Sequence, residues 1–198
     1  MSGLLYHDGN RGLQDEFGSR RLADRLAERA RTAFTDDDKA FAESCLYFFL
    51  ATADVDGRPD CSFKGGAPGF LRVTGPSDLA FPDYDGNGMF KSLGNLAANP
   101  HVGLLFIAMH DKPRRLRVNG TARIVRDDPL LQEIPGAQLI VRVTASAIFS
   151  NCPRYIPQLT LTEPSIYTPQ KGGTPVEPAW KSFDAFKGIV PPRAPTAT

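Results

Sequence analysis

The segment from Phe81 to Pro100, FPDYDGNGMFKSLGNLAANP, holds the residues best suited to binding an anion. An amphipathic helix is expected over residues 88–98, and it is preceded by residues that favour turns and helix starts: Asp83, Asp85, Gly86, Asn87 and Gly88. Lys91 and Ser92 fall in the first helical turn, where the macrodipole disfavours a cation. A phosphate bound at this N-terminus would explain the lysine. The structural alternative is a solvated lysine after a capped turn.

A second candidate segment is Cys61–Phe70, CSFKGGAPGF, in which a strand carries Ser62 and Lys64 and then ends in glycines. Missing side chains allow a flat ligand to approach the backbone closely. The structural alternative is an irregular loop between two strands. The segment therefore predicts either a ligand contact or a plain connection.

Two further groups of polar residues lie on or after expected strands. Arg115 and Arg117 share the polar face of one strand, and Asn151, Cys152 and Arg154 follow the end of another in FSNCPRYIP. The first pair could equally form a solvated face, and the second group could be a proline-bounded turn with a surface arginine.

The elements that position these residues are mostly strands. Strands are expected at 45–53, 59–64, 70–74, 78–81, 101–109, 115–125 and 137–149. The runs 45–53 and 101–109 are apolar without interruption, which indicates strands buried on both faces. By contrast, 115–125 alternates between apolar and polar residues. Short strands at hairpin spacing with few helices predict a mainly β fold, an antiparallel β-barrel with peripheral α-helices.

Helices are expected outside this barrel. An amphipathic helix is predicted over 12–31, with Leu13, Phe17, Leu22, Leu26 and Ala30 on one face. Thr35 and three following acids predict a short second helix. Another short helix is expected from Asp127 through Ile134. The proline-rich and glycine-rich tail beyond Pro157 is expected to be extended, except around Trp180–Phe186.

Composition limits the classes of function. The 198 residues are 41% hydrophobic, which suits one domain over 1–198 with a helical segment 12–44 and an irregular tail 158–198. Lysine and arginine number 23 against 22 acids, so no net field favours nucleic acid or a membrane surface. The apolar runs are too short to span a bilayer, and we expect a cytoplasmic protein. Three separated cysteines predict no disulfide framework and no metal site.

Seven segments occur in an order that resembles the pyridoxamine 5'-phosphate oxidase-like family of FMN-binding split barrels, and its uncharacterised, oxidase-related branch most closely. They span Leu13 to about Tyr167 and read LQDEFGSRRLADRL, YFFLATADVDGRPDCSFKGG, PGFLRV, FPDYDGNGMFKSLGN, NPHVGLLF, LRVNGTARI and NCPRYI. The resemblance implies a six-stranded antiparallel FMN-binding split barrel. It also implies a homodimer with one FMN in each of two clefts at the subunit interface.

The resemblance assigns roles by position. The residues along the isoalloxazine ring would be Ser62, Phe63, Lys64 and Gly65. The phosphate side would comprise Asp83, Asn87, Met89, Lys91 and Ser92. Arg117 would reach the flavin across the subunit interface, and Asn151, Cys152 and Arg154 would lie near the cofactor or substrate pocket.

The chain departs from the pattern of authentic pyridoxamine phosphate oxidases. In those enzymes an arginine and a lysine bracket the second strand. They also have an Arg-Lys pair in the phosphate helix and a C-terminal Arg-x-His. Here the strand has Cys61 and Lys64, the helix has Lys91 and Ser92, and the tail has no histidine. These departures weigh against a vitamin B6 substrate without deciding whether pyridoxamine phosphate is turned over. We therefore expect an FMN-dependent oxidoreductase acting on an unidentified small molecule.

No catalytic side chain is assigned, because a flavin carries the hydride chemistry itself. The sequence also contains no G-x-S-x-G or H-E-x-x-H motif. The alternative function is a flavin or deazaflavin binding, storage or sensor protein without efficient turnover.

Overall fold

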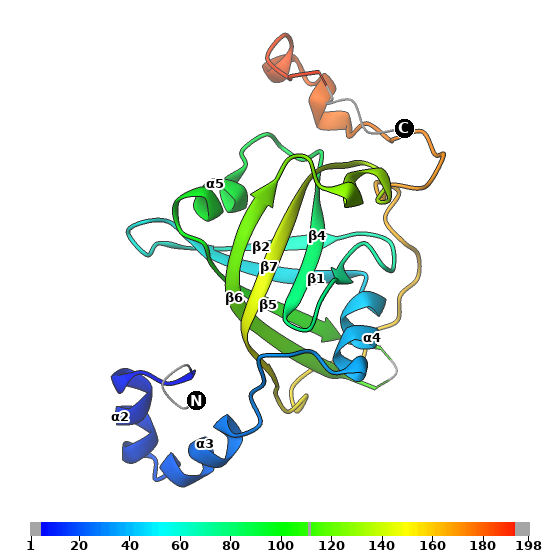
Figure 1. Ribbon diagram of the computed structural model, residues 1–198. Coiled ribbons are helices and arrows are strands. Elements are labelled where there is room, and N and C mark those ends of the chain that lie inside the picture. Colours follow the sequence, from blue (N-terminus) through cyan, green and yellow to red (C-terminus); the bar gives the residue numbers. More distant parts are fainter. Residues whose placement is uncertain (1–4, 111, 193–198) are drawn as a thin grey trace.

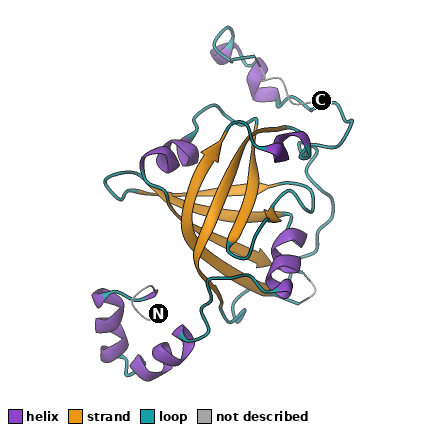
Figure 2. Cartoon of the chain, in the orientation of Figure 1, coloured by secondary structure: helices purple, strands orange, loops and turns teal. Residues whose placement is uncertain are grey.

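The computed structural model describes residues 5–110 and 112–192, and its centre is one curved antiparallel sheet (Figures 1 and 2). The strand order is β2-β1-β5-β6-β7-β4-β3. The strands are β1 (Tyr47–Ala53), β2 (Pro59–Gly65), β3 (Arg72–Val73), β4 (Asp78–Tyr84), β5 (His101–Ala108), β6 (Arg114–Val125) and β7 (Ala137–Ser150). The predicted fold class, an antiparallel β-barrel with peripheral helices, is confirmed. The described strands number seven instead of six because the two-residue β3 adds to one edge.

The barrel interior is filled by large apolar side chains that alternate along the strands. Phe48, Phe81 and Phe106 are fully buried, and the ring of Phe48 lies 5.0 Å from that of Phe81 and 5.4 Å from that of Phe106. Removing a side chain of this size from water stabilises a fold by roughly 1.5–3 kcal/mol. The alternation predicted for β6 is confirmed, since Leu116 and Val118 are buried between exposed neighbours.

The prediction that β1 and β5 are buried on both faces is wrong for a single chain. Both strands alternate: Phe48, Leu50, Leu104 and Phe106 point inward and are buried. The outward side chains are Tyr47 and Phe49 on β1 and Leu105 and Ile107 on β5, and all four are only half-buried. The described chain covers this outer face of the sheet only in part.

The barrel is split where its two edges meet. β3 pairs only with Leu79 and Ala80, so the second half of β4 has no hydrogen-bonded neighbour on that side among the described strands. Pro82 suits such an edge because proline has no backbone N–H to donate. Asp83, expected in the turn before the helix, is instead paired within β4 opposite Leu139.

Helix α5 (Lys91–Ala98) lies at one end of the barrel, where Leu93 and Leu96 are buried (Figure 1). Asn95 Nδ2 donates a hydrogen bond of 3.0 Å to Thr52 Oγ1 and so ties the helix to β1. The predicted start at Gly88 is wrong by three residues. Phe90 has a φ of 47°, in the left-handed region, so helical geometry begins only after it.

Helix α4 (Asp36–Ser44) begins as predicted at Thr35. The Thr35 hydroxyl accepts from the Asp38 N–H at 3.1 Å, and the Asp38 carboxylate accepts from the Thr35 N–H at 3.0 Å. This capping box satisfies N–H groups that a helix start leaves without partners.

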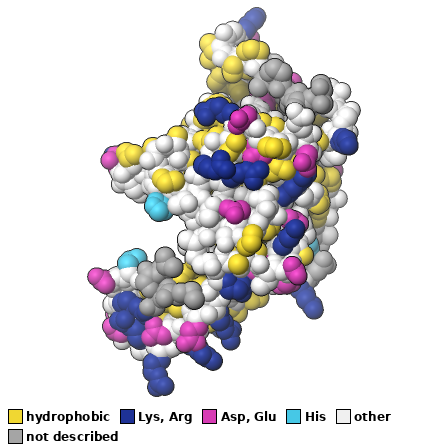
Figure 3. Space-filling view, in the orientation of Figure 1, with side chains coloured by type: hydrophobic (Ala, Val, Ile, Leu, Met, Phe, Trp, Pro, Cys, Tyr) yellow, Lys and Arg dark blue, Asp and Glu magenta, His cyan; other side chains and the backbone are white. Residues whose placement is uncertain are grey.

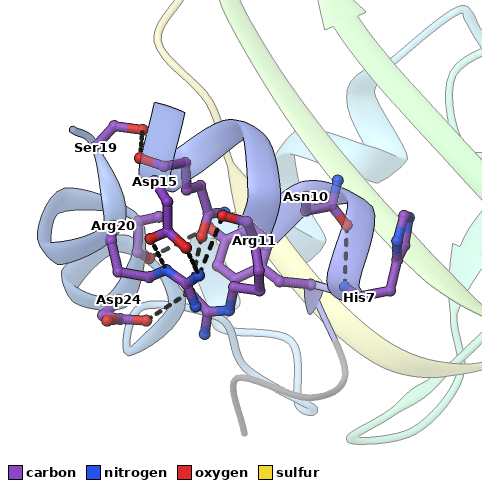
Figure 4. A network of polar contacts seen from close by, with 10 residues as sticks. His7, Asn10, Arg11, Asp15, Ser19, Arg20 and Asp24 are labelled. Carbon is purple, nitrogen blue, oxygen red and sulfur yellow. Dashed lines mark hydrogen bonds and ion pairs between the residues drawn. The ribbon is translucent and has the colours of Figure 1, made fainter. Parts of the chain in front are cut away.

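The single helix predicted over 12–31 is wrong. The chain forms α2 (Asp8–Glu16) and α3 (Arg20–Ala27), separated at Gly18, whose φ of 62° breaks the helical path. A polar network holds the two helices together, with Arg11 bonded to Asp24 at 2.8 Å and Arg20 to Asp15 (Figure 4).

The apolar ridge of these two helices stays exposed: Leu13, Phe17, Leu22 and Leu26. An antiparallel bridge between Arg31 and Ile148, with N···O distances of 2.9 and 2.7 Å, connects the segment to β7. In the space-filling view a notch separates these helices from the barrel body (Figure 3).

The remaining segments are short. The helix expected over 127–134 is a 3-10 helix, η1 (Pro129–Gln132), which Asp128 caps. The tail is extended except for η2 (Ala179–Ser182) and η3 (Asp184–Phe186), where the sequence predicted regular structure. Across the described residues, every helix is too short or too polar to cross a bilayer.

Candidate functional site

One face of β2 gathers the polar residues that the sequence singled out. Asp60, Ser62 and Lys64 alternate with Cys61 and Phe63, so the first three share one side of the strand. Ser92 Oγ on α5 lies 2.8 Å from Ser62 Oγ and 3.3 Å from Asp60 Oδ2. Lys64 Nζ lies 3.8 Å from Asp83 Oδ1 on β4. We call Asp60, Ser62, Lys64, Asp83 and Ser92 the β2–α5 cluster.

Ser92 connects the helix to the strand. The residue is 5% exposed, and its hydroxyl already contacts Ser62 and Asp60. A ligand would therefore meet the Ser92 backbone N–H more readily than its hydroxyl. The sequence interpretation missed Asp60, although its position two residues before Ser62 on a strand placed it on the same face.

Lys64 and Asp83 face each other across the split in the barrel. Burial raises the pKa of the Asp83 carboxyl, while the Lys64 ammonium acts to lower it. Their closest atoms are 3.8 Å apart, which is too long for a hydrogen bond. Both groups can therefore hydrogen-bond a ligand placed between the two strands.

The N-terminus of α5 is open. Phe90, its first flanking residue, provides no side-chain cap, unlike Thr35 at the start of α4. Before it, Asn87 Oδ1 accepts from the Met89 N–H at 3.0 Å in an exposed turn. Lys91 is exposed in the first turn. Uncapped N–H groups beside an ammonium are suited to holding an anion.

The carboxylate of Asp54 in the same chain also lies within electrostatic range of Lys91. The pKa of the half-buried Asp54 carboxyl is lowered mainly by the backbone N–H of Arg58, and Lys91 adds a smaller contribution. The alternative, a solvated lysine after a capped turn, therefore also has support: Lys91 is exposed and interacts with the Asp54 carboxylate without a bound anion.

Phe63 and Arg117 lie on the outer face of the sheet, away from the β2–α5 cluster in the same chain. The Phe63 ring is 61% exposed and stacks on Tyr47 at 5.2 Å. Arg117 is exposed on β6, which is the third strand from β2 in the sheet order. Within one chain, the side chains of Phe63 and Arg117 are therefore on the opposite face of the sheet from the cluster.

The glycines after Ser62 do not leave open space for a ligand at their Cα atoms. A Cβ on Gly65 would lie 2.7 Å from the Phe63 ring, and one on Gly66 would lie 2.5 Å from Phe70. Packing of aromatic rings against the backbone therefore accounts for both glycines.

Asn151, Cys152 and Arg154 follow the end of β7, four strands from β2 in the sheet order. Cys152 and Arg154 are exposed. The Oδ1 atom of Asn151 and the Nε atom of Arg115 are buried, and neither has a hydrogen-bond partner among the described residues. Extending the β6–β7 register by one residue places these two residues opposite each other. Buried polar atoms without partners are costly, so this corner can accept a ligand or a second chain.

Metal chemistry has no obvious location in the described part of the chain, which contains no group of three histidine, cysteine or acidic residues able to hold an ion. Cys61 and Cys152 are exposed thiols. Burial raises the pKa of the Cys45 thiol to about 11, which disfavours the reactive thiolate.

No curated protein matches the chain. Among solved structures, HupZ from Group A Streptococcus is 16% identical, with 59% of this chain and 93% of that chain covered and a TM-score of 0.48. An FMN-binding protein from Syntrophomonas wolfei subsp. wolfei is 11% identical, with coverage of 72% and 96% and a TM-score of 0.44. HutZ, the heme storage protein from Vibrio cholerae, is 19% identical, with coverage of 58% and 92% and a TM-score of 0.44.

These identities are too low to transfer a ligand or an activity. The family comparison is more extensive: residues 34–164 of the 198 match the family model described as pyridoxamine 5'-phosphate oxidase. This range includes every strand and α5, together with the whole β2–α5 cluster. As its sequence motifs predicted, the chain belongs to the pyridoxamine 5'-phosphate oxidase family.

Proposed function

We propose that this protein binds FMN as a homodimer and is an FMN-dependent oxidoreductase acting on a small molecule. The observation that carries the proposal is the open N-terminus of α5, with Lys91 in its first turn, directly beside the polar face of β2. Membership of the family supports a flavin at this place.

The phosphate of FMN would be held at the start of α5. Lys91 supplies a positive charge, and the uncapped N–H groups of the first turn supply hydrogen-bond donors. The turn around Asn87 and Met89 is exposed and could contribute further backbone donors. The residues present thus fit a dianion, although the carboxylates of Asp60, beside Ser92, and Asp54, within electrostatic range of Lys91, oppose it.

The ring and ribityl parts of FMN would lie along the free edge of β2. Among the described strands this one pairs only with β1, so its other edge presents unpaired backbone groups. Ser62, Lys64 and Asp83 add donors and acceptors along that edge. When bound, FMN supplies hydride and electron transfer, while these residues bind it, orient it and exclude water.

The homodimer is supported by the outer face of the sheet. Aromatic rings of Tyr47, Phe49 and Phe63 cluster there at centroid distances of 5.2–6.0 Å. The same face has a shallow hollow of about 380 Å³, whose lining includes Ala51, Gly103 and Asn119. An aromatic cluster and a hollow on the same face allow two copies of the chain to pack against each other about a two-fold axis.

A second chain would also complete groups that one chain leaves apart. Arg117 stands on this outer face, and the unpartnered Arg115 Nε belongs to the same strand. In a two-fold dimer, Arg117 and the Asn151–Arg154 segment could approach the partner's β2–α5 cluster. We therefore propose that Asn151, Cys152 and Arg154 act at the substrate side of the partner's flavin.

The competing proposal is a flavin or deazaflavin binding, storage or sensor protein without efficient turnover. Both proposals require a bound chromophore, but only the enzyme requires that a reductant is consumed. The test is to titrate the purified protein with FMN, then to add nicotinamide dinucleotides and follow loss of the flavin absorption without oxygen. Faster reduction than that of free FMN supports the oxidoreductase. Tight FMN binding with unchanged reduction supports storage or sensing. Absence of FMN binding contradicts the oxidoreductase and the flavin form of the alternative.

A further inference from the structure

The C-terminal segment 151–192, which we call the strap, runs along the outside of the barrel and reaches the α5 end of the molecule (Figure 1). Near its start, the Leu159 N–H donates to the Met109 carbonyl at 2.6 Å. Further along, Pro169 packs against Gly136 so closely that a Cβ there would lie 2.9 Å from the proline ring. These contacts guide the strap from one end of the barrel to the other.

At the far end, Lys181 fixes the strap to the loop before α5. Its ammonium forms an ion pair and hydrogen bond with Asp85, and it lies 3.2 Å from Glu177 Oε2. The Lys181 side chain is 12% exposed and that of Asp85 is 20% exposed. Hydrogen bonding to Asp85, and then to Glu177, raises the pKa of Lys181, so the ammonium stays charged at neutral pH.

This contact differs from an ordinary surface ion pair. Exposed pairs contribute little because water and salt screen them. Here both side chains are mostly covered, and the two residues are 96 positions apart in the chain. Loss of the Lys181 side chain would remove this covered ion pair and, with it, the contact between the strap and the loop before α5.

Asp85 marks one end of the loop that leads to the proposed phosphate site. Residues 86–90 are all exposed and include two glycines, so the loop itself buries little surface that could restrict it. Asp83, two positions earlier, faces Lys64, and Lys91 begins α5 after the loop. Lys181 therefore restrains the loop at the residue where it leaves β4.

We propose that Lys181 is a positioning residue for the phosphate of FMN, an inference that rests on the proposed FMN site. Lys181 acts in two ways, and both favour binding of the phosphate. It holds the 85–90 loop in the conformation that presents α5, and its positive charge offsets the negative charge of Asp85 on the approach to a bound dianion.

Comparison of FMN with riboflavin tests the proposal, because the two ligands differ only by the phosphate. We expect Lys181→Ala to weaken FMN binding about tenfold, in Kd measured by flavin fluorescence, with riboflavin binding unchanged. Lys181→Arg should retain most of the FMN affinity, because it keeps the charge and the hydrogen bond. Lys187→Ala, which alters an exposed lysine six residues further along the strap, is the matched control and should bind both ligands as the wild type does.

Trp180 provides a second readout, because it is the one tryptophan in the chain and is adjacent to Lys181. Its emission anisotropy without ligand should fall in Lys181→Ala and in Asp85→Asn alike, since either change releases the strap from the loop. The thermal midpoint of each apo variant shows whether the barrel remains folded.

Each outcome decides between the proposals. A wild type that prefers FMN to riboflavin, together with a Lys181→Ala variant that keeps the same preference, overturns the role of Lys181 alone. Equal weakening of both ligands shows a general structural effect and also overturns it. A wild type that binds neither ligand, or binds both equally, overturns the proposed phosphate site and the role of Lys181 with it.

Discussion

Single residues in and beside the β2–α5 cluster show how charge is arranged at the candidate site. Lys91 stands where a helix start favours anions, and Lys64 and Asp83 face each other without a direct hydrogen bond. Such arrangements cost free energy in an empty site and gain it when a ligand supplies the missing partners. The unfavourable position of the Lys91 charge could be predicted from the sequence, because the order of charges along a helix can be read without a structure.

We predict that Lys91→Gln weakens FMN binding about tenfold, the cost of one charge-assisted hydrogen bond of roughly 1.5 kcal/mol. Isothermal calorimetry with FMN measures the change. Lys39→Gln, which removes an exposed lysine from α4, is the control and should leave the affinity as it is. Equal affinity of wild type and Lys91→Gln would remove Lys91 from the phosphate site.

Asp128 offers a stability prediction that depends on pH. The Arg142 guanidinium hydrogen-bonds its carboxylate, at 2.9 Å for one of the two bonds, and is the largest cause that lowers the pKa of the buried Asp128. A lowered pKa stabilises the folded protein above the unfolded value of about 3.9, and this stability is lost as pH falls through the folded pKa.

Asp128→Asn should therefore reduce the free energy of unfolding by roughly 1.5–3 kcal/mol at neutral pH. Asparagine keeps the ability to cap η1, so the loss reports mainly on the charge. Denaturant unfolding at several pH values should show the difference from wild type shrinking below about pH 4. A difference that stays constant down to acidic pH would mean that the ion pair does not stabilise the fold.

At the scale of elements, periodicity predicted the strands because alternation is a local property of the chain. β6 and β7 were predicted nearly to their ends, and the start of α4 followed from Thr35 and its acids. The breaks were less predictable. Gly18 divides the N-terminal helix and Phe90 delays α5 through backbone conformations that residue type alone does not determine.

The candidate site shows the same contrast: residues could be predicted from their own segment, but contacts between distant segments could not. Ser62, Lys64, Asp83 and Ser92 were each predicted from their own segment, and the fold brings all four together. Asp60 was missed although strand alternation pointed to it. The contact of Lys181 with Asp85 could not be predicted, because the strap has no periodicity that would fix its path along the barrel.

Two glycines, Gly120 in β6 and Gly94 in α5, are expected to change the stability of the protein in opposite directions when each is replaced by alanine. β6 has an irregular register at Asn119/Gly120, and a Cβ on Gly120 would lie 2.1 Å from the Thr144 carbonyl oxygen. By contrast, Gly94 lies on the exposed side of α5 with nothing within 4 Å of such a Cβ.

Gly120→Ala should destabilise the barrel by roughly 2–4 kcal/mol, because backbone on two strands must separate. Gly94→Ala should stabilise the protein by up to about 1 kcal/mol through helix propensity. Thermal unfolding of both variants measures the two effects. A Gly120→Ala variant as stable as the wild type would show that the β6–β7 irregularity can rearrange freely.

At the scale of the whole molecule, the distribution of charge does not indicate a particular kind of binding partner. Positive and negative side chains are intermixed over the face seen in Figure 3, in keeping with a formal charge of +1. The more informative feature is the partly exposed aromatic cluster on the outer face of the sheet. Its position supports association with a second chain rather than with a polyanion.

Phe63→Glu should convert the proposed dimer to a monomer and abolish tight FMN binding, because a carboxylate would be buried against the partner. Within one chain Phe63 is 61% exposed, so the barrel itself should remain folded. Val55→Glu changes a residue that is 72% exposed in the β1–β2 turn and should leave the dimer intact. Size-exclusion chromatography with light scattering separates these outcomes, and a dimeric Phe63→Glu protein would place the interface elsewhere.

The most direct measurement of the central claim is sedimentation velocity of the wild-type protein with added FMN, recorded at both the protein and the flavin absorption bands. The account predicts one boundary with the mass of two chains, carrying one FMN per chain. Protein that sediments as a monomer, with the flavin signal left behind as free FMN, would contradict it.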